Sequence, residues 1–123
     1  AISAWCNAVS DGRSLRSDGT GEQTRDMVHV DNVVHANILA ANNEKIFDGV
    51  CYNVGTGKSV SNNEILSHFK KRFSDVNVYN AQAREGDVMH TLANIDKINK
   101  ELGYKPVIGF DEGLEMTFNW WGF

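Results

Sequence analysis

This 123-residue chain has one proline, two cysteines and no long run of apolar residues. A single proline beside 41% hydrophobic and 23% charged residues is typical of a folded protein, not of a disordered or collagen-like chain. A membrane-spanning helix needs about eighteen consecutive apolar residues, and this chain contains no apolar run of that length. No basic segment precedes an apolar one at the start, so no secretory signal is indicated. We therefore expect a cytoplasmic protein with no membrane partner.

The chain also lacks an excess of positive charge. Sixteen acidic residues outnumber twelve Lys and Arg, which gives a net charge of -4. Proteins that bind nucleic acid need surplus Lys and Arg against the phosphate backbone, so we expect no nucleic-acid partner. Cys6 and Cys51 fit neither a metal-ligand spacing nor a disulfide framework. Both are expected to be reduced and buried, with no metal site.

The length of the chain is that of one domain, and residues 1–123 are expected to form a single one. The first ten residues already read as the middle of an apolar helix, without a cap residue or an initiator methionine. We expect the chain to be a fragment of a longer protein.

Apolar residues at three- and four-residue spacing predict five helices. They lie over residues 1–10, 31–42, 61–73, 94–103 and 110–121. Short extended segments are predicted at 27–30, 50–54, 76–79 and 90–93, and loops at 15–23 and 81–87. Because helices and strands alternate, the predicted class is α/β (α+β), with a small mixed sheet and about five helices.

No familiar catalytic or cofactor motif is complete. Gly55-Thr56-Gly57-Lys58-Ser59 ends like a phosphate-binding P-loop, but Tyr52 occupies the position of its first glycine. Val60 stands where a dinucleotide fingerprint has its third glycine. No Tyr is followed four residues later by Lys, and the histidines have no metal-ligand spacing. We therefore assign no catalytic, cofactor-binding or metal residue.

Two arginines and one aspartate stand out in loops. Arg25 ends a glycine-bearing loop, and Arg84 and Asp87 share the sequence Arg84-Glu85-Gly86-Asp87. A guanidinium matches phosphate oxygens bidentately, and a carboxylate accepts hydrogen bonds from sugar hydroxyls, so the trio could bind a nucleoside diphosphate. The alternative is that these arginines only pair with nearby acids such as Asp26 or Glu85.

The same residues belong to a longer pattern, which begins with Gly21-Glu22-Gln23-Thr24-Arg25-Asp26-Met27-Val28-His29-Val30-Asp31-Asn32-Val33-Val34. It continues in order with Tyr52-Asn53-Val54-Gly55-Thr56-Gly57, Arg84-Glu85-Gly86-Asp87, Ala93-Asn94-Ile95-Asp96-Lys97, Leu102-Gly103-Tyr104 and Glu112-Gly113-Leu114. This pattern resembles the C-terminal part of the extended short-chain dehydrogenase/reductase family, in its nucleotide-sugar epimerase/dehydratase branch, and is UDP-glucose 4-epimerase-like.

The resemblance implies a substrate-binding domain in which Arg25 and Arg84 contact the diphosphate of a UDP-sugar and Asp87 accepts from the ribose hydroxyls. It implies that the full-length parent is an NAD-dependent epimerase (an isomerase) or a dehydratase. The glycine-rich NAD site of the family's N-terminal Rossmann domain and its Tyr/Lys pair are absent here. Without them the chain is not expected to catalyse the reaction alone. Asn32 replaces an acidic residue often found at its position, which we expect to alter only the helix start.

A second hypothesis is a non-catalytic, self-associating module derived from such an enzyme. Its homo-oligomer would form through the face that the Rossmann domain covers in the family. The aromatic C-terminus favours it, with Phe118, Trp120, Trp121 and Phe123.

Overall fold

The computed structural model describes residues 1–44 and 46–123. Their contacts divide the chain into two compact units, which we describe one at a time. The first unit contains Ala1–Arg25 and Val60–Thr91, and the second contains Asp26–Ser59 and Leu92–Phe123. Within the described residues there are five helices and four short strands, so the expected α/β (α+β) class is confirmed.

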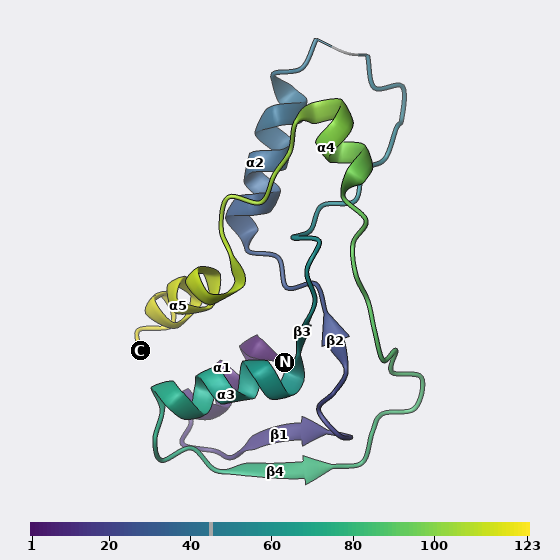
Figure 1. The fold of residues 1–123 in the computed structure, drawn as a ribbon. Coiled ribbons are helices and arrows are strands. Elements are labelled where there is room, and N and C mark those ends of the chain that lie inside the picture. The colour runs from purple at the N-terminus through teal and green to yellow at the C-terminus, as the bar shows by residue number, and fades with distance from the viewer. Residues whose placement is uncertain (45) are drawn as a thin grey trace. The chain divides into compact units, whose positions relative to one another are not determined.

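The first unit combines two helices with two small sheets (Figure 1). Its elements are α1 (Ile2–Ser10), β1 (Leu15–Asp18), β2 (Thr24–Arg25), β3 (Val60–Ser61), α3 (Asn62–Arg72) and β4 (Val78–Ala81). Strands β1 and β4 are parallel, in the register Leu15 with Val78 and Asp18 with Ala81. Strand β2 pairs with β3 in the antiparallel direction.

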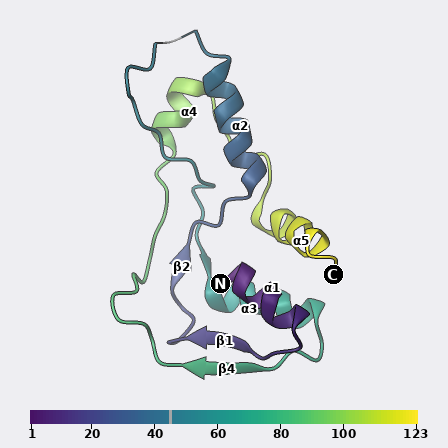
Figure 2. The same ribbon diagram turned by 180° about the vertical axis from the view of Figure 1, so that it is seen from behind.

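Helices α1 and α3 form the core of the first unit. They lie side by side in both ribbon views (Figures 1 and 2), and the rings of Trp5 and Phe69 meet edge to face at 5.4 Å. The Trp5 indole also donates to the carbonyl of Arg16 at 2.7 Å, which ties α1 to β1. Cys6 is fully buried, and this desolvation raises the pKa of its thiol.

Helix α3 begins as its sequence predicts. The side chain of Ser61 caps the helix by accepting a hydrogen bond from the backbone N–H of Glu64 at 3.1 Å. Lys70, Lys71 and Arg72 occupy the last turn, where positive charge suits the helix dipole.

The second unit is helical and contains α2 (Val30–Ala41), α4 (Asp96–Leu102) and α5 (Phe110–Trp120). Helix α2 packs against α4 around Ala36, Ile98, Leu102 and Tyr104. The buried Tyr104 hydroxyl donates to the carbonyl of Gly55 at 2.8 Å. Burial and the negative charge of Asp26 together raise the pKa of Tyr104.

Several strand predictions were wrong. Residues 15–18 were expected in a loop but form β1, because their partner β4 lies far away in sequence and leaves no local signal. No strand is assigned over 27–30 or 50–54 among the described residues. Helix α2 begins at Val30, one residue before the expected start at residue 31, and His29 is its cap. The strand expected at 76–79 lies two residues later, as β4.

Two further observations concern the cysteines and the membrane. Both cysteines are free, as expected, but Cys51 is exposed and not buried. None of the helices in the described part of the chain has the length and apolar character needed to span a membrane.

Candidate functional site

The parallel pair β1 and β4 organises one edge of the first unit (Figure 1). Because the strands are parallel, their carboxyl ends meet at the same edge, where Asp18 faces Ala81. Ligands of parallel sheets commonly bind just beyond these carboxyl ends. The segment that follows β4 carries Arg84 and Asp87, so two residues of the predicted trio lie just beyond this edge.

Arg25 and Asp87 are brought together. The Arg25 Nη2 atom donates to Oδ1 of Asp87 at 2.6 Å, although the two residues are far apart in sequence. Its Nη1 donates to the carbonyl of Thr24 at 2.8 Å and to that of Met89 at 3.4 Å. Arg25 does pair with an acid, but the acid is the predicted site residue Asp87 and not Asp26.

Asp26 binds a glycine-containing turn within the second unit. Its carboxylate accepts from the Thr56 N–H at 2.9 Å, the Thr56 hydroxyl at 2.6 Å and the Gly57 N–H at 3.0 Å. Gly57 has a φ of +69°, which favours glycine. The Gly55-Thr56-Gly57 segment is therefore a turn that hydrogen bonds to Asp26 hold in place, and its glycines have a structural role.

Arg84 pairs with a residue that the sequence did not single out. Its Nε donates to Oδ2 of Asp18 at 2.8 Å, and its side chain is 68% exposed. The Asp87 N–H donates to the Arg84 carbonyl at 3.2 Å, so both residues belong to one tight turn. The expected alternative partner, Glu85, is not part of this ion pair.

One turn links the two predicted arginines, because Arg25 donates to the side chain of Asp87 and the Asp87 N–H donates to the carbonyl of Arg84. Burial, and then the positive charges of Arg84 and Arg25, lower the pKa of the Ala1 amino group. The structure thus groups Arg25, Arg84 and Asp87 without making one carboxylate their common partner.

Sequence reasoning missed Asp18. Its Oδ1 accepts from the Nε of Arg16 at 2.6 Å while Oδ2 accepts from Arg84, and its side chain is only 15% exposed. The hydrogen bond from Arg16 and the positive charges of Arg16 and Arg84 lower the pKa of this carboxyl. The sequence carried no signal for it, because the buried and exposed residues of Leu15-Arg16-Ser17-Asp18 alternate only once β1 has paired with β4.

The resulting cluster consists of Arg16, Asp18, Arg25, Arg84 and Asp87 and carries a local positive charge. Three guanidinium groups face two carboxylates, which leaves one net positive charge in a chain whose net charge is -4. Arginine clusters of this kind suit phosphate oxygens, to which guanidinium groups donate bidentate hydrogen bonds.

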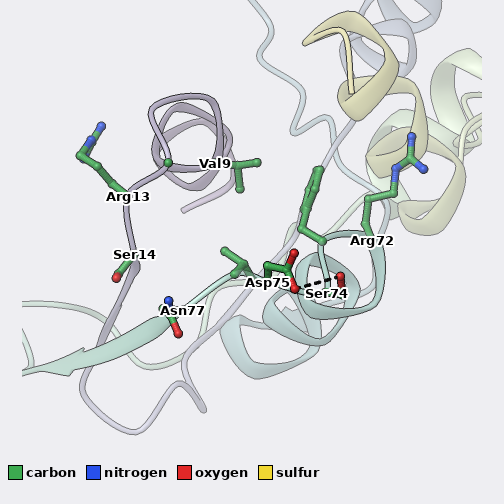
Figure 3. A pocket seen from close by; sticks show the side chains of 10 residues that line it. Val9, Arg13, Ser14, Arg72, Ser74, Asp75 and Asn77 are labelled. Atoms are coloured by element: carbon green, nitrogen blue, oxygen red, sulfur yellow. Dashed lines mark hydrogen bonds between the residues drawn. The ribbon is translucent and has the colours of Figure 1, made fainter.

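A cavity of about 400 Å³ lies elsewhere in the first unit (Figure 3). Its lining includes Arg13 and Arg72, whose side chains extend from separate elements and point away from one another. Arg13 is paired with Asp11 at 2.7 Å. Since these two guanidinium groups do not converge, we do not assign the substrate to this cavity.

In the part of the chain that the structure describes, no three His, Cys, Asp or Glu side chains lie close enough together to hold a metal ion. The absence of a metal site stays a prediction.

Residues 2–117 match the family described as GDP-mannose 4,6 dehydratase. The chain is 39% identical over 121 residues to a putative UDP-glucose 4-epimerase of Methanocaldococcus jannaschii, covering 97% of this chain and 38% of the relative. Among solved structures, UDP-glucose 4-epimerase of Thermotoga maritima with UDP-glucose superposes with a TM-score of 0.87 at 28% identity, covering 98% and 38%. MoeE5 with UDP-glucuronic acid and NAD superposes with a TM-score of 0.86 at 33% identity, covering 97% and 40%. The chain thus spans well under half of the length of these proteins.

Proposed function

The chain belongs to the GDP-mannose 4,6-dehydratase family, in the nucleotide-sugar epimerase/dehydratase branch of the extended short-chain dehydrogenases/reductases, and from this membership we propose that it binds a UDP-sugar. In this proposal residues 1–123 are the substrate-binding domain of a longer NAD-dependent enzyme and are not catalytic alone. UDP is the proposed nucleotide of the substrate because the descriptions of the relatives given above name UDP-sugars.

One observation carries the proposal: Arg25, Arg84 and Asp87 gather in the first unit near the carboxyl ends of a parallel strand pair. We assign Arg25 and Arg84 to the diphosphate and Asp87 to the ribose hydroxyls. Asp87 uses Oδ1 for Arg25, and in the described contacts its Oδ2 receives no hydrogen bond. That oxygen is available to accept from a hydroxyl while the ion pair persists.

The residues present do not fit the NAD phosphates. The Gly55-Thr56-Gly57 turn is the closest approach to a phosphate-binding loop, but Asp26 already accepts from the N–H groups of Thr56 and Gly57. A carboxylate at that position would also repel a pyrophosphate. We therefore assign NAD to the remaining part of the parent enzyme and derive no step through it from this chain.

A titration with UDP tests the proposal. Arg84→Ala should weaken binding about tenfold or more, because hydrogen bonds to charged groups contribute about 1.5–3 kcal/mol, and Arg25→Ala should act in the same direction. Arg13→Ala is the matched control, since Arg13 is an exposed arginine of the same unit that pairs with Asp11. Isothermal titration calorimetry measures each dissociation constant.

The site assignment would be contradicted if Arg13→Ala weakened binding as much as Arg84→Ala. An unmodified chain that shows no UDP binding would contradict the proposed function itself.

A second candidate function is self-association. Of the C-terminal aromatic residues, Phe118 is buried and Trp121 stacks on Phe123, whereas Trp120 is 80% exposed. Helix α2 also favours this candidate, because it exposes Val30, Val34 and Ile38 at four-residue spacing.

A further inference from the structure

We propose that Asp18 is a positioning residue that holds the guanidinium group of Arg84 in place for a diphosphate, an inference that rests on the proposed function. Asp18 is the only carboxylate in the described ion pairs that bridges two arginines. It does so with separate oxygens, Oδ1 for Arg16 and Oδ2 for Arg84. This bridge is an arrangement that the sequence pattern did not indicate.

The bridge leaves the Nη1 and Nη2 atoms of Arg84 available to donate hydrogen bonds to a ligand. Its described side-chain hydrogen bond uses Nε alone. Nη1 and Nη2 form the other edge of the planar guanidinium, and this edge can donate two parallel hydrogen bonds to phosphate oxygens. Asp18 therefore fixes the orientation of the plane without occupying the donors that would bind the ligand.

Asp18 is well placed to act as an anchor because its backbone is fixed. The following Gly19 N–H donates to the carbonyl of Ala81 at 2.9 Å, at the end of the parallel strand pair. The Asp18 carbonyl itself accepts from the side chain of Gln23 at 2.9 Å. A largely buried, doubly tethered residue thus holds an exposed arginine on the neighbouring segment. Such preorganisation lowers the entropy that a ligand must remove on binding.

Charge explains why a carboxylate is needed at this position. Without the negative charge, the guanidinium groups of Arg16 and Arg84 would repel one another, and Arg84 would turn away into solvent. With it, the three side chains keep one net positive charge, so the site still attracts an anion. Asp18→Asn would keep the shape of the side chain but remove the negative charge that holds Arg84.

A double-mutant cycle tests the inference, with UDP as the probe and calorimetry as the readout. Asp18→Asn and Arg84→Ala are each expected to weaken binding about tenfold, and the double variant should also lose only about tenfold, since both act through one guanidinium. Independent contributions would give about a hundredfold loss. Asp11→Asn is the matched control, because Asp11 also pairs with an arginine two residues away and is expected to leave binding unchanged.

A merely structural role for Asp18 would lower stability without this non-additivity, so the thermal unfolding midpoint of each variant is measured in parallel. If Asp18→Asn unfolds, Asp18→Glu and Asp18→Gln provide a second pair of equal length that differs in charge. The Glu variant should bind UDP at least about threefold more tightly than the Gln variant, as hydrogen bonds to charged groups are the stronger ones.

The outcomes separate the two claims. Wild-type-like binding by Asp18→Asn together with weak binding by Arg84→Ala overturns the positioning role and leaves the proposed function intact. Equal binding by the Glu and Gln variants also overturns the positioning role. Absence of UDP binding by the unmodified chain overturns both.

Discussion

Asn32 shows how much a single buried amide contributes to the second unit. It is 0% exposed, its Oδ1 accepts from the N–H groups of Val107 and Ile108, and its Nδ2 donates to the Ile108 carbonyl. These bonds attach helix α2 to the segment that leads into α5. The sequence suggested only an altered helix start, because the partners lie 75 and 76 residues away.

We expect Asn32→Leu to lower the free energy of unfolding by about 2–5 kcal/mol, because two backbone N–H groups and one carbonyl lose their partner inside the protein. Urea denaturation followed by circular dichroism measures the change. Asn119→Leu, at an exposed position of α5, is the control and should change stability by no more than about 0.5 kcal/mol. A similar small effect for both variants would show that the Asn32 bonds do not hold the unit together.

The residues of the candidate site were predictable only in part. Arg25, Arg84 and Asp87 could be chosen from the sequence because a guanidinium or a carboxylate has a recognisable chemistry in any loop. Their partners could not, since Asp18 and Arg84 are 66 residues apart and meet only through the pairing of β1 with β4. Long-range pairing of this kind leaves no trace in local periodicity.

At the scale of elements, helices were predictable and short strands were not. The apolar spacing placed all five helices, since each buries a stripe that repeats along its own sequence. It did not indicate which face of α2 is buried. Asn32 and Ala36 are the buried residues of this helix, whereas Val34 and Ile38 are exposed.

This exposed face of α2 leads to a prediction about association. If self-association uses this face, Val34→Glu should abolish it, because a charge on an apolar contact surface is costly to bury. Sedimentation velocity over a range of concentrations measures the oligomeric state. Asn7→Glu, at an exposed position of α1, adds the same charge away from the Val30, Val34 and Ile38 stripe and should leave association unchanged. A chain that is monomeric at every concentration would contradict the self-association candidate.

At the scale of the whole molecule, the order of motifs was more informative than any one of them. Taken singly, the glycine turns and the loop arginines favoured ordinary structural roles. The order in which these motifs follow one another along the chain nevertheless identified the family that residues 2–117 match. Composition alone could not do this, because it describes any folded domain. That residues 1–123 form one domain stays a prediction, as does the identity of the base and sugar.

Mapping of UDP on the backbone amide resonances of the chain is the most direct test of the diphosphate site. We predict that added UDP shifts the resonances of residues 16–18, 24–25 and 84–87, which surround the five-residue charge cluster, and leaves those lining the cavity at 9–14 and 72–77 unchanged. Shifts confined to the cavity, or none at saturating UDP, would contradict the account.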